Sequence, residues 1–306
     1  MNAVLIIDKP SGLTSHDVVN RVRRILNQRS VGHLGTLDPM ATGILPLVLG
    51  NFTRLAQFYT ASEKCYEGTI RFGFSTDTYD AEGDPTSPPQ QVTLSAQDLE
   101  PLAARFRGVI EQTPPPFSAK KVHGVPAYKL ARKQKEVVLK PVQIEIKEFD
   151  ILSIETDRAT FRARVASGTY MRSVAHDLGQ ALGCGAHLQS LRRTQVGEFT
   201  LDDAHTLDAL AAVAGKCRLS PEPLGESNGN LESLVELFVH PRRLLPAFPA
   251  VTADEPTTAR IRSGRTVNLP DLSRARQVKV FSNQRELIAI ATRVAGTLFH
   301  PKIVLS

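Results

Sequence analysis

A single carboxylate, that of Asp38, stands in a segment whose composition suits chemistry. Glycines at positions 32, 35 and 43 surround it, and glycine lets a backbone approach a ligand closely. Pro39 follows directly and favours an extended backbone at Asp38. The sequence therefore predicts a loop over residues 30–46 that presents one carboxylate, and such loops often carry function. The same residues also fit a helix N-cap at Asp38 with Pro39 in the first turn, which would involve no chemistry.

The whole segment from Gly32 to Pro46 reads GHLGTLDPMATGILP and resembles the signature loop of the TruB family of tRNA pseudouridine-55 synthases. Further blocks follow in the family's order: DKPSGLTS from Asp8, KCYE from Lys64, TDTYDAEG from Thr76, PPFSAKK from Pro115, SGTYMRS from Ser167, GAHL from Gly185 and LRR from Leu191. These blocks span about residues 4–200, so the resemblance is specific. The C-terminal part, roughly 60 residues, resembles a PUA-like RNA-binding domain only loosely.

The resemblance implies three catalytic residues: Asp38, Tyr66 and Arg172. Converting uridine to pseudouridine detaches the base from C1′ and rejoins it through C5, so a nucleophile must hold one fragment covalently. The resemblance gives that role to Asp38 and leaves open whether it adds to C6 of the base or to C1′ of the ribose. It implies that the Arg172 guanidinium keeps the pKa of Asp38 low and orients it. Tyr66 is expected to stack on the flipped base and assist deprotonation at C5.

The resemblance also implies residues that bind the substrate. Tyr170 matches a second tyrosine of the active site, and Leu191 matches an apolar wall of the uracil pocket. His33 is expected to pack into the T loop as the base is extruded. Lys9 is expected to support the pocket or to contact phosphate. Asp80 belongs to the same set, although it also fits a turn cap.

Lys120 opens a basic run in which Tyr128 is interleaved: Lys120, Lys121, Lys129, Arg132, Lys133 and Lys135. This pattern predicts an insertion that grips RNA phosphates, although a solvated charged surface has the same composition. Three other residues depart from the family's usual pattern, namely Leu34, Phe117 and Tyr79, the last at a position where Ser is common. None of them replaces a chemical group that the reaction demands.

The elements expected to position these residues alternate between strand and helix patterns. Apolar runs and alternation predict strands over residues 4–7, 66–74, 137–154 and 159–166 and in the C-terminal part; helical spacing predicts helices starting at Thr14 or Ser15, and over 96–106, 170–182 and 234–239. These patterns predict an α+β protein. The resemblance implies a mixed, largely antiparallel sheet flanked by helices, with a small, mostly β, PUA-like C-terminal domain.

The domain boundaries follow from composition and from the resemblance. We predict a catalytic domain over residues 1–232, with an RNA-binding insertion at about 112–140, and a PUA-like RNA-binding domain over 240–306. The stretch at about 215–233 is rich in Ser, Pro, Gly and Asn, which is typical of a linker or an exposed insertion. Residues 241–306 carry 11 Lys and Arg against 4 acids, a charge of +7 in a chain of +6. This excess favours a polyanion-binding surface, with a solvated face as the alternative.

Composition narrows the class of protein further. A chain of 306 residues with 42% hydrophobic and 22% charged residues excludes collagen, coiled coil and wholesale disorder. The three cysteines, Cys65, Cys184 and Cys217, are too far apart for a disulfide framework or a CxxC metal site. We therefore expect a reducing compartment, and the family resemblance implies an enzyme without metal or cofactor. Neither a signal peptide nor a membrane span is predicted, so we expect a cytoplasmic protein that does not bind membranes.

The resulting hypothesis is a stand-alone enzyme that isomerises the uridine at position 55 in the T loop of tRNA by base flipping. Two alternatives remain: a guide-RNA-dependent synthase of the dyskerin type, and an RNA-binding or tRNA-folding module without catalysis. The run from Gly124 to Arg132 resembles the stand-alone bacterial form, so we expect no guide RNA. A monomer is the default expectation.

Overall fold

The computed structural model describes residues 1–118, 120–122, 125–127, 130, 139–218, 228–270 and 275–305. Its main feature is a sheet of ten strands: β1 (Ala3–Lys9), β2 (Val31–His33), β3 (Thr42–Leu49), β4 (Lys64–Phe72), β5 (Gly108–Gln112), β8 (Val142–Glu155), β9 (Arg158–Val165), β10 (Ala186–Val196), β11 (Phe199–Thr200) and β12 (Ala204–His205). Their order is β12-β1-β3-β10-β4-β9-β8-β5, with β2 paired to β3 and β11 to β10. Within this sheet, as far as the described residues go, only the β1–β12 and β3–β10 strand pairs are parallel.

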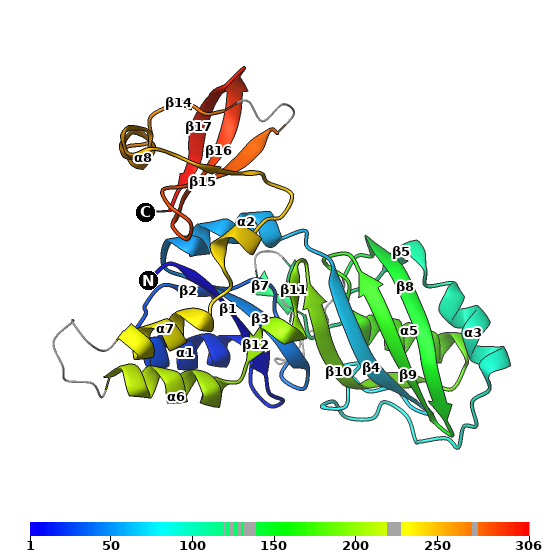
Figure 1. Cartoon of the computed structure of the whole chain (residues 1–306). Helices are drawn as coiled ribbons and strands as arrows, with labels where there is room; N and C mark the ends of the chain where they lie inside the picture. Colours follow the sequence, from blue (N-terminus) through cyan, green and yellow to red (C-terminus); the bar gives the residue numbers. More distant parts are fainter. Residues whose placement is uncertain are drawn as a thin grey trace.

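Helices cover this sheet in two groups: α1 (Ser15–Leu26), α6 (Leu207–Arg218) and α7 (Asn228–Glu236) lie near β1, whereas α3 (Ala96–Ala104) and α5 (Met171–Ala181) lie at the other end (Figure 1). The first group shares a buried cluster with β1 and β3, and the second packs on the apolar face of β4, β8 and β9. Helix α1 begins with a capping box in which Thr14 and Asp17 satisfy each other's backbone N–H. The remaining short elements are η1 (Gly50–Leu55), α2 (Ala56–Tyr59), β6 (Lys121–Val122), β7 (Val125–Pro126) and η2 (Leu201–Asp203).

The C-terminal part forms a separate sheet of five strands. Its elements are η3 (Pro241–Arg243), β13 (Ala250–Thr252), α8 (Glu255–Arg262), β14 (Val267–Asn268), β15 (Gln277–Phe281), β16 (Leu287–Ala295) and β17 (Leu298–Val304), with the strand order β13-β15-β16-β17-β14. This unit has a core of its own. In Figure 1 it stands above α2 and β2, away from α3 and α5.

The two parts are joined by a further buried cluster that contains Phe52 of η1 and Phe199 of the large sheet together with Phe281 of the small sheet. A polar contact lies inside this junction. Glu198 accepts hydrogen bonds from Tyr59 Oη at 2.7 Å and from the Leu245 N–H at 2.9 Å. Because the junction is apolar and its polar groups are paired, the C-terminal unit is docked firmly on the large sheet.

The predicted α+β class and the largely antiparallel sheet are confirmed, and so is the small, β-rich C-terminal unit. The loop predicted over residues 30–46 is wrong at both ends, because β2 and β3 lie within it. Strand β3 was not predicted for two reasons. It is buried almost throughout and therefore shows no alternation of apolar and polar residues, and Gly43 and Pro46 interrupt its apolar run. Strand β10 was not predicted either.

The linker predicted at about 215–233 is also wrong at both ends, since α6 continues to Arg218 and α7 begins at Asn228. Residues 219–227 lie outside the described residues. The short helix predicted at 234–239 is the end of α7, which starts six residues earlier. Within the described chain, no helix is both long and apolar enough to span a membrane.

Candidate active site

The segment that carries Asp38 connects β2 to β3 in the middle of the large sheet. Hydrogen bonds from other segments hold the backbone on both sides of Asp38. Ser15, the first residue of α1, donates from Oγ to Leu37 O at 3.1 Å and accepts from the Leu37 N–H at 2.8 Å. The Pro39 carbonyl accepts from the Gly12 N–H at 2.9 Å and from Lys9 Nζ at 3.0 Å. The backbone therefore has little freedom where the carboxylate emerges. No helix follows Asp38, so the N-cap interpretation is wrong.

Lys9 is fully buried and donates three hydrogen bonds to carbonyl oxygens, those of Pro10, Leu13 and Pro39. Burial lowers its pKa to about 8. All three ammonium hydrogens are used within the protein, so this geometry favours support of the loop over contact with phosphate.

Arg193 of β10 supports the same loop from the other side. It is buried, and its guanidinium donates to Gly35 O at 3.1 Å, to Thr36 O at 3.2 Å and to Ile44 O at 2.9 Å. Arg193 thus binds both the start of the loop and the strand that follows it. Sequence analysis included Arg193 in a family block but gave it no role.

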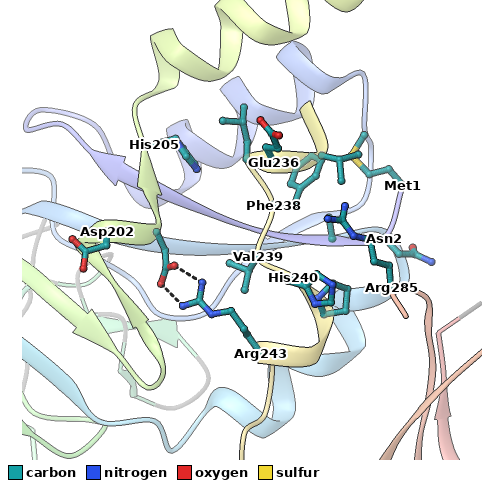
Figure 2. Close-up of a pocket in the computed structure, with 15 residues that line it drawn as sticks. Met1, Asn2, Asp202, His205, Glu236, Phe238, Val239, His240, Arg243 and Arg285 are labelled. Carbon is teal, nitrogen blue, oxygen red and sulfur yellow. Dashed lines mark hydrogen bonds and ion pairs between the residues drawn. The ribbon is translucent and has the colours of Figure 1, made fainter. Parts of the chain in front are cut away.

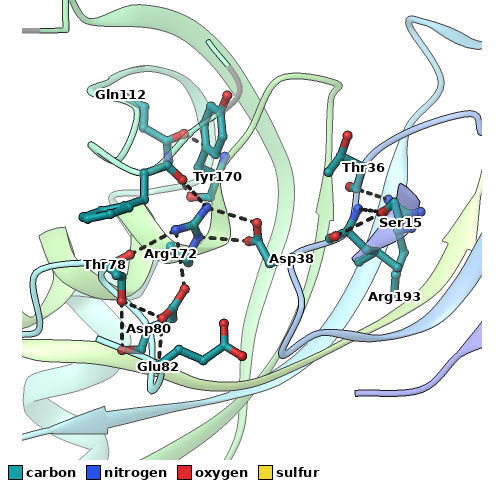
Figure 3. A network of polar contacts seen from close by, with 12 residues as sticks. Ser15, Thr36, Asp38, Thr78, Asp80, Glu82, Gln112, Tyr170, Arg172 and Arg193 are labelled. Carbon is teal, nitrogen blue, oxygen red and sulfur yellow. Dashed lines mark hydrogen bonds and ion pairs between the residues drawn. The ribbon is translucent and has the colours of Figure 1, made fainter. Parts of the chain in front are cut away.

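The carboxylate of Asp38 meets the guanidinium of Arg172, in the first turn of α5 (Figure 3). Arg172 Nη2 donates to Asp38 Oδ1 at 3.1 Å, and Nε lies 2.9 Å from Oδ2. The arginine side chain is only 6% exposed, whereas that of Asp38 is 33% exposed. The ion pair therefore has a buried cation and a carboxylate that solvent or a ligand can reach.

The rest of the guanidinium is held by the turn between β4 and α3 and by the carbonyl of Phe117, which follows β5. Arg172 Nη1 donates to Thr78 O at 3.1 Å and lies 3.4 Å from Asp80 Oδ2, while Nη2 also donates to Phe117 O at 3.0 Å. Asp80 is buried and also accepts from Thr78 Oγ1 at 2.6 Å and from the Glu82 N–H at 3.0 Å. Asp80 therefore shapes the turn, as the turn-cap alternative predicted, and it also faces Arg172 (Figure 3).

Burial raises the pKa of Asp38, and the nearby Asp80 carboxylate adds to this rise, while Arg172 acts in the opposite direction. The expectation that Arg172 keeps the pKa of Asp38 low is therefore wrong in its net direction. Desolvation of a carboxylate penalises its charged form, and here that penalty outweighs the attraction of one guanidinium. The pKa of Glu82, an exposed residue, is also raised, by partial desolvation and by its acidic neighbours Asp80 and Asp38.

Tyr170 lies at the start of α5, two residues before Arg172, and is half-buried. Its backbone is fixed by Gln112, which accepts from the Tyr170 N–H at 2.9 Å and donates to Tyr170 O at 3.1 Å (Figure 3). Burial raises the pKa of the Tyr170 phenol. Gln112 was missed because it is 58 residues away in the chain and no local pattern links the two.

Tyr66 and Leu191 lie on β4 and β10, whose pairing places Tyr66 opposite Arg193 and Leu191 opposite Gly68. Both side chains are 8% exposed and belong to the buried cluster that also contains Leu37, next to Asp38. Cross-strand partners lie on one face of a sheet, so the tyrosine and the leucine share the face that adjoins the Asp38 loop.

His33 and Lys120 are less closely connected to this network. His33 ends β2, is partly buried, and accepts from the Gly35 N–H through Nδ1 at 3.3 Å. Burial and the charge of Arg193 lower its pKa. Within the described residues, the backbone carbonyl of Lys120 accepts a hydrogen bond from the Ala127 N–H at 2.7 Å. Most of the predicted basic run, from Lys129 to Lys135, lies outside the described residues.

A cavity of about 650 Å³ lies elsewhere, between the start of β1, residues 235–241 and Arg285 of the C-terminal unit (Figure 2). The ion pair of Arg243 with Asp203 stands at its wall, 2.6 Å apart. Its lining includes none of the residues that the resemblance implies. Over the described part of the chain, no cluster of three or more His, Cys, Asp or Glu side chains is arranged to hold a metal ion.

Comparison with known sequences defines the class of protein. Residues 23–171 match the family model described as TruB family pseudouridylate synthase (N terminal domain), and residues 172–234 match the tRNA pseudouridylate synthase B C-terminal domain. The tRNA pseudouridine synthase B of Solibacter usitatus is 50% identical over the full length of both chains. That of Aquifex aeolicus is 45% identical over 68% of this chain and 73% of its own.

The chain belongs to the TruB family of pseudouridylate synthases, as predicted, and is therefore an isomerase that forms pseudouridine. Solved structures agree with this fold. A chain in the structure of an H/ACA RNP bound to a substrate RNA containing 2'-deoxyuridine superposes with a TM-score of 0.72, with 23% identity over 99% of this chain and 85% of that one. A chain of a Cbf5-Nop10-Gar1 complex gives 0.71 with 24% identity over the same shares. At such identities the likeness concerns the fold alone.

Proposed function

We propose that this protein isomerises the uridine at position 55 in the T loop of tRNA, with Asp38 as the nucleophile. The observation that carries the proposal is the contact of Arg172 with both oxygens of a partly exposed Asp38, at 3.1 and 2.9 Å. A tRNA substrate is supported by relatives named tRNA pseudouridine synthase B, one of which matches the whole chain. The T-loop position rests on the likeness of the Gly32–Pro46 segment to the family's signature loop.

The reaction exchanges one bond of the base for another. The N1–C1′ bond breaks and a C5–C1′ bond forms, while C5 loses a proton and N1 gains one, so no redox partner is needed. A carboxylate oxygen of Asp38 attacks either C6 of the base, which it leaves after the C5–C1′ bond has formed, or C1′ of the ribose, which it leaves as that bond forms. The target base must leave its stack to reach this oxygen.

The surroundings of Asp38 suit a nucleophile whose carboxylate must be held in a fixed orientation. Arg172 fixes the carboxylate plane through two contacts, and its own position is fixed by the carbonyls of Thr78 and Phe117. Since Lys9 and Ser15 hold the flanking backbone, little reorganisation is needed when the substrate arrives. The raised pKa of Asp38 makes its ionised carboxylate more basic and thus a stronger nucleophile. It also means that a smaller fraction of Asp38 is ionised in acid solution.

The remaining candidate residues would receive the RNA. Tyr66 would stack on the flipped base and assist removal of the C5 proton, and Leu191 and Tyr170 would form the walls of the uracil pocket. His33 and Lys120 would contact the T loop. We propose that residues 1–232 form the catalytic domain, with its RNA-binding insertion at about 112–140, and that residues 240–306 form a PUA-like domain that binds RNA. We also propose a cytoplasmic monomer that needs neither metal nor cofactor.

The test is pseudouridine mapping on an unmodified tRNA transcript incubated with the purified protein and no guide RNA. We expect modification at position 55 alone. Asp38→Asn, which keeps the shape but removes the nucleophile, should abolish the product and leave tRNA binding within about threefold. Residual turnover within about tenfold of wild type would remove Asp38 from the role of nucleophile.

The same assay addresses the alternatives. The superposed chains from the H/ACA RNP and from the Cbf5-Nop10-Gar1 complex share the fold, which by itself does not separate a stand-alone from a guide-dependent synthase. Product that appears only after a guide RNA is added would favour that alternative. Binding of tRNA without any product would favour an RNA-folding module.

A further inference from the structure

The ring of Tyr79 lies flat on the imidazole of His176, with centroids 3.8 Å apart and planes at 10°. His176 stands one helical turn after Arg172 on α5, so both side chains leave the same face of the helix. That face meets the turn that contains Tyr79. His176 Nδ1 is buried and has no hydrogen-bond partner among the described residues. Burial lowers the pKa of His176, which favours the neutral ring.

Tyr79 adopts an unusual backbone conformation, with φ of +65°. For a residue with a side chain this region costs roughly 1–2 kcal/mol, so other contacts must hold it in place. Its carbonyl accepts from the Leu188 N–H of β10 at 3.0 Å, and its N–H donates to Thr76 O at 3.2 Å. The stacked ring adds a third anchor, on α5.

Both chain neighbours of Tyr79 contact the same nitrogen of Arg172. Thr78 O accepts from Nη1 at 3.1 Å, and Asp80 Oδ2 lies 3.4 Å from it. The conformation at Tyr79 decides the relative direction of these two groups. A change at Tyr79 would therefore move both partners of Nη1 at once, and with them the guanidinium that orients Asp38.

We propose that the Tyr79–His176 stack is a positioning device that locks the 78–80 turn onto α5 and thereby aims Arg172 at Asp38. The proposal rests on the proposed role of Asp38 and Arg172. The ring of Tyr79, and not its phenolic hydroxyl, makes the stacking contact.

The test compares single-turnover rates at saturating tRNA with tRNA dissociation constants for wild type, Tyr79→Phe, Tyr79→Ala and His176→Ala. We expect Tyr79→Ala and His176→Ala to slow the chemical step about tenfold or more with binding within about twofold. Tyr79→Phe keeps the stack and should restore a rate close to wild type. Phe106→Ala removes a different aromatic pair, with Phe149 at 6.2 Å, and serves as the matched control with an unchanged rate.

A double-mutant cycle tests whether the stack acts through Arg172. Adding Tyr79→Ala to Arg172→Lys should cause no further loss, because the guanidinium that the stack aims is already gone. Additive losses would overturn the proposal, as would a wild-type rate for folded Tyr79→Ala or an equal loss in Tyr79→Phe. If Tyr79→Ala does not fold, His176→Ala decides by the same criteria. Wild type that forms no pseudouridine would instead contradict the proposed function.

Discussion

Gly43 of β3 lies so close to the backbone of Arg193 on β10 that a Cβ atom at Gly43 would stand 2.2 Å from Arg193 O. The two residues are direct partners in the parallel pairing of these strands. The Arg193 side chain then binds Gly35, Thr36 and Ile44, so the same residue closes the Asp38 loop through both its backbone and its guanidinium. The position of Asp38, the proposed nucleophile, depends on this close approach.

Gly43→Ala should therefore destabilise the protein by two separate effects. At φ of +97° any side chain is strained, which costs roughly 1–2 kcal/mol, and the clash with Arg193 adds about 1–3 kcal/mol. Gly183→Ala is the matched control, because Gly183 has φ of +75° with open space around its Cα. Denaturant unfolding measures both variants. If both variants lose the same free energy of unfolding, strand β10 moves away from the new methyl group without an energetic penalty.

The fall of the reaction rate at low pH should report the protonation of the Asp38 carboxylate. The nucleophile must be ionised, and its pKa is raised by burial, so the rate should fall at a higher pH than the ordinary aspartate value of about 3.9. Asp80→Asn removes a negative neighbour and should shift this fall to lower pH, whereas Arg172→Met should shift it to higher pH. Single-turnover rates between roughly pH 4 and 8, with circular dichroism to verify folding, measure these shifts. Shifts in the same direction for both variants would contradict the assignment.

Two substitutions separate the proposed roles of the Tyr66 ring and of its hydroxyl group. Tyr66→Phe retains the ring in the buried cluster beside Leu37 and removes the group proposed to assist at C5. We expect a rate loss of about 100-fold or more with nearly unchanged binding. Tyr66→Leu should lose stacking as well and weaken binding. A Phe variant as fast as wild type would leave Tyr66 with a packing role alone.

The basic C-terminal unit should be tested by substitution, because its deletion would uncover buried residues such as Phe52 and Tyr59. Arg265 and Arg276 are exposed in this unit. If each contacts a phosphate, Arg→Gln at both positions should lower the slope of log affinity against log salt by about 0.7–0.9 per contact. Arg105→Gln on the exposed end of α3 is the control for a general loss of charge. An unchanged slope would mean that these arginines face solvent in the complex.

Much of the fold could be predicted from local patterns. The capping box of Thr14 and Asp17 and the apolar stripe of α1 are signals within a few residues, and α1 begins where they indicate. Strand β3 could not be predicted in this way, since a strand buried on both faces lacks the alternation that reveals one. Strand β10 was missed although Leu191 and Arg193 alternate towards its interior face, because a buried arginine does not resemble a core residue.

The sequence by itself determined the family, and it pointed to the residues proposed to carry the chemistry, because the blocks around Asp38, Tyr66 and Arg172 resemble one family in type and spacing. Only the tertiary structure decided how they act on one another. Asp38 and Arg172 are 134 residues apart in the chain, and no local rule relates them. The direction of the Asp38 pKa, the burial of Lys9 and the stack on Tyr79 depend on desolvation and on contacts between distant segments. Such terms arise only when the chain has folded, because burial is a property of the assembled core.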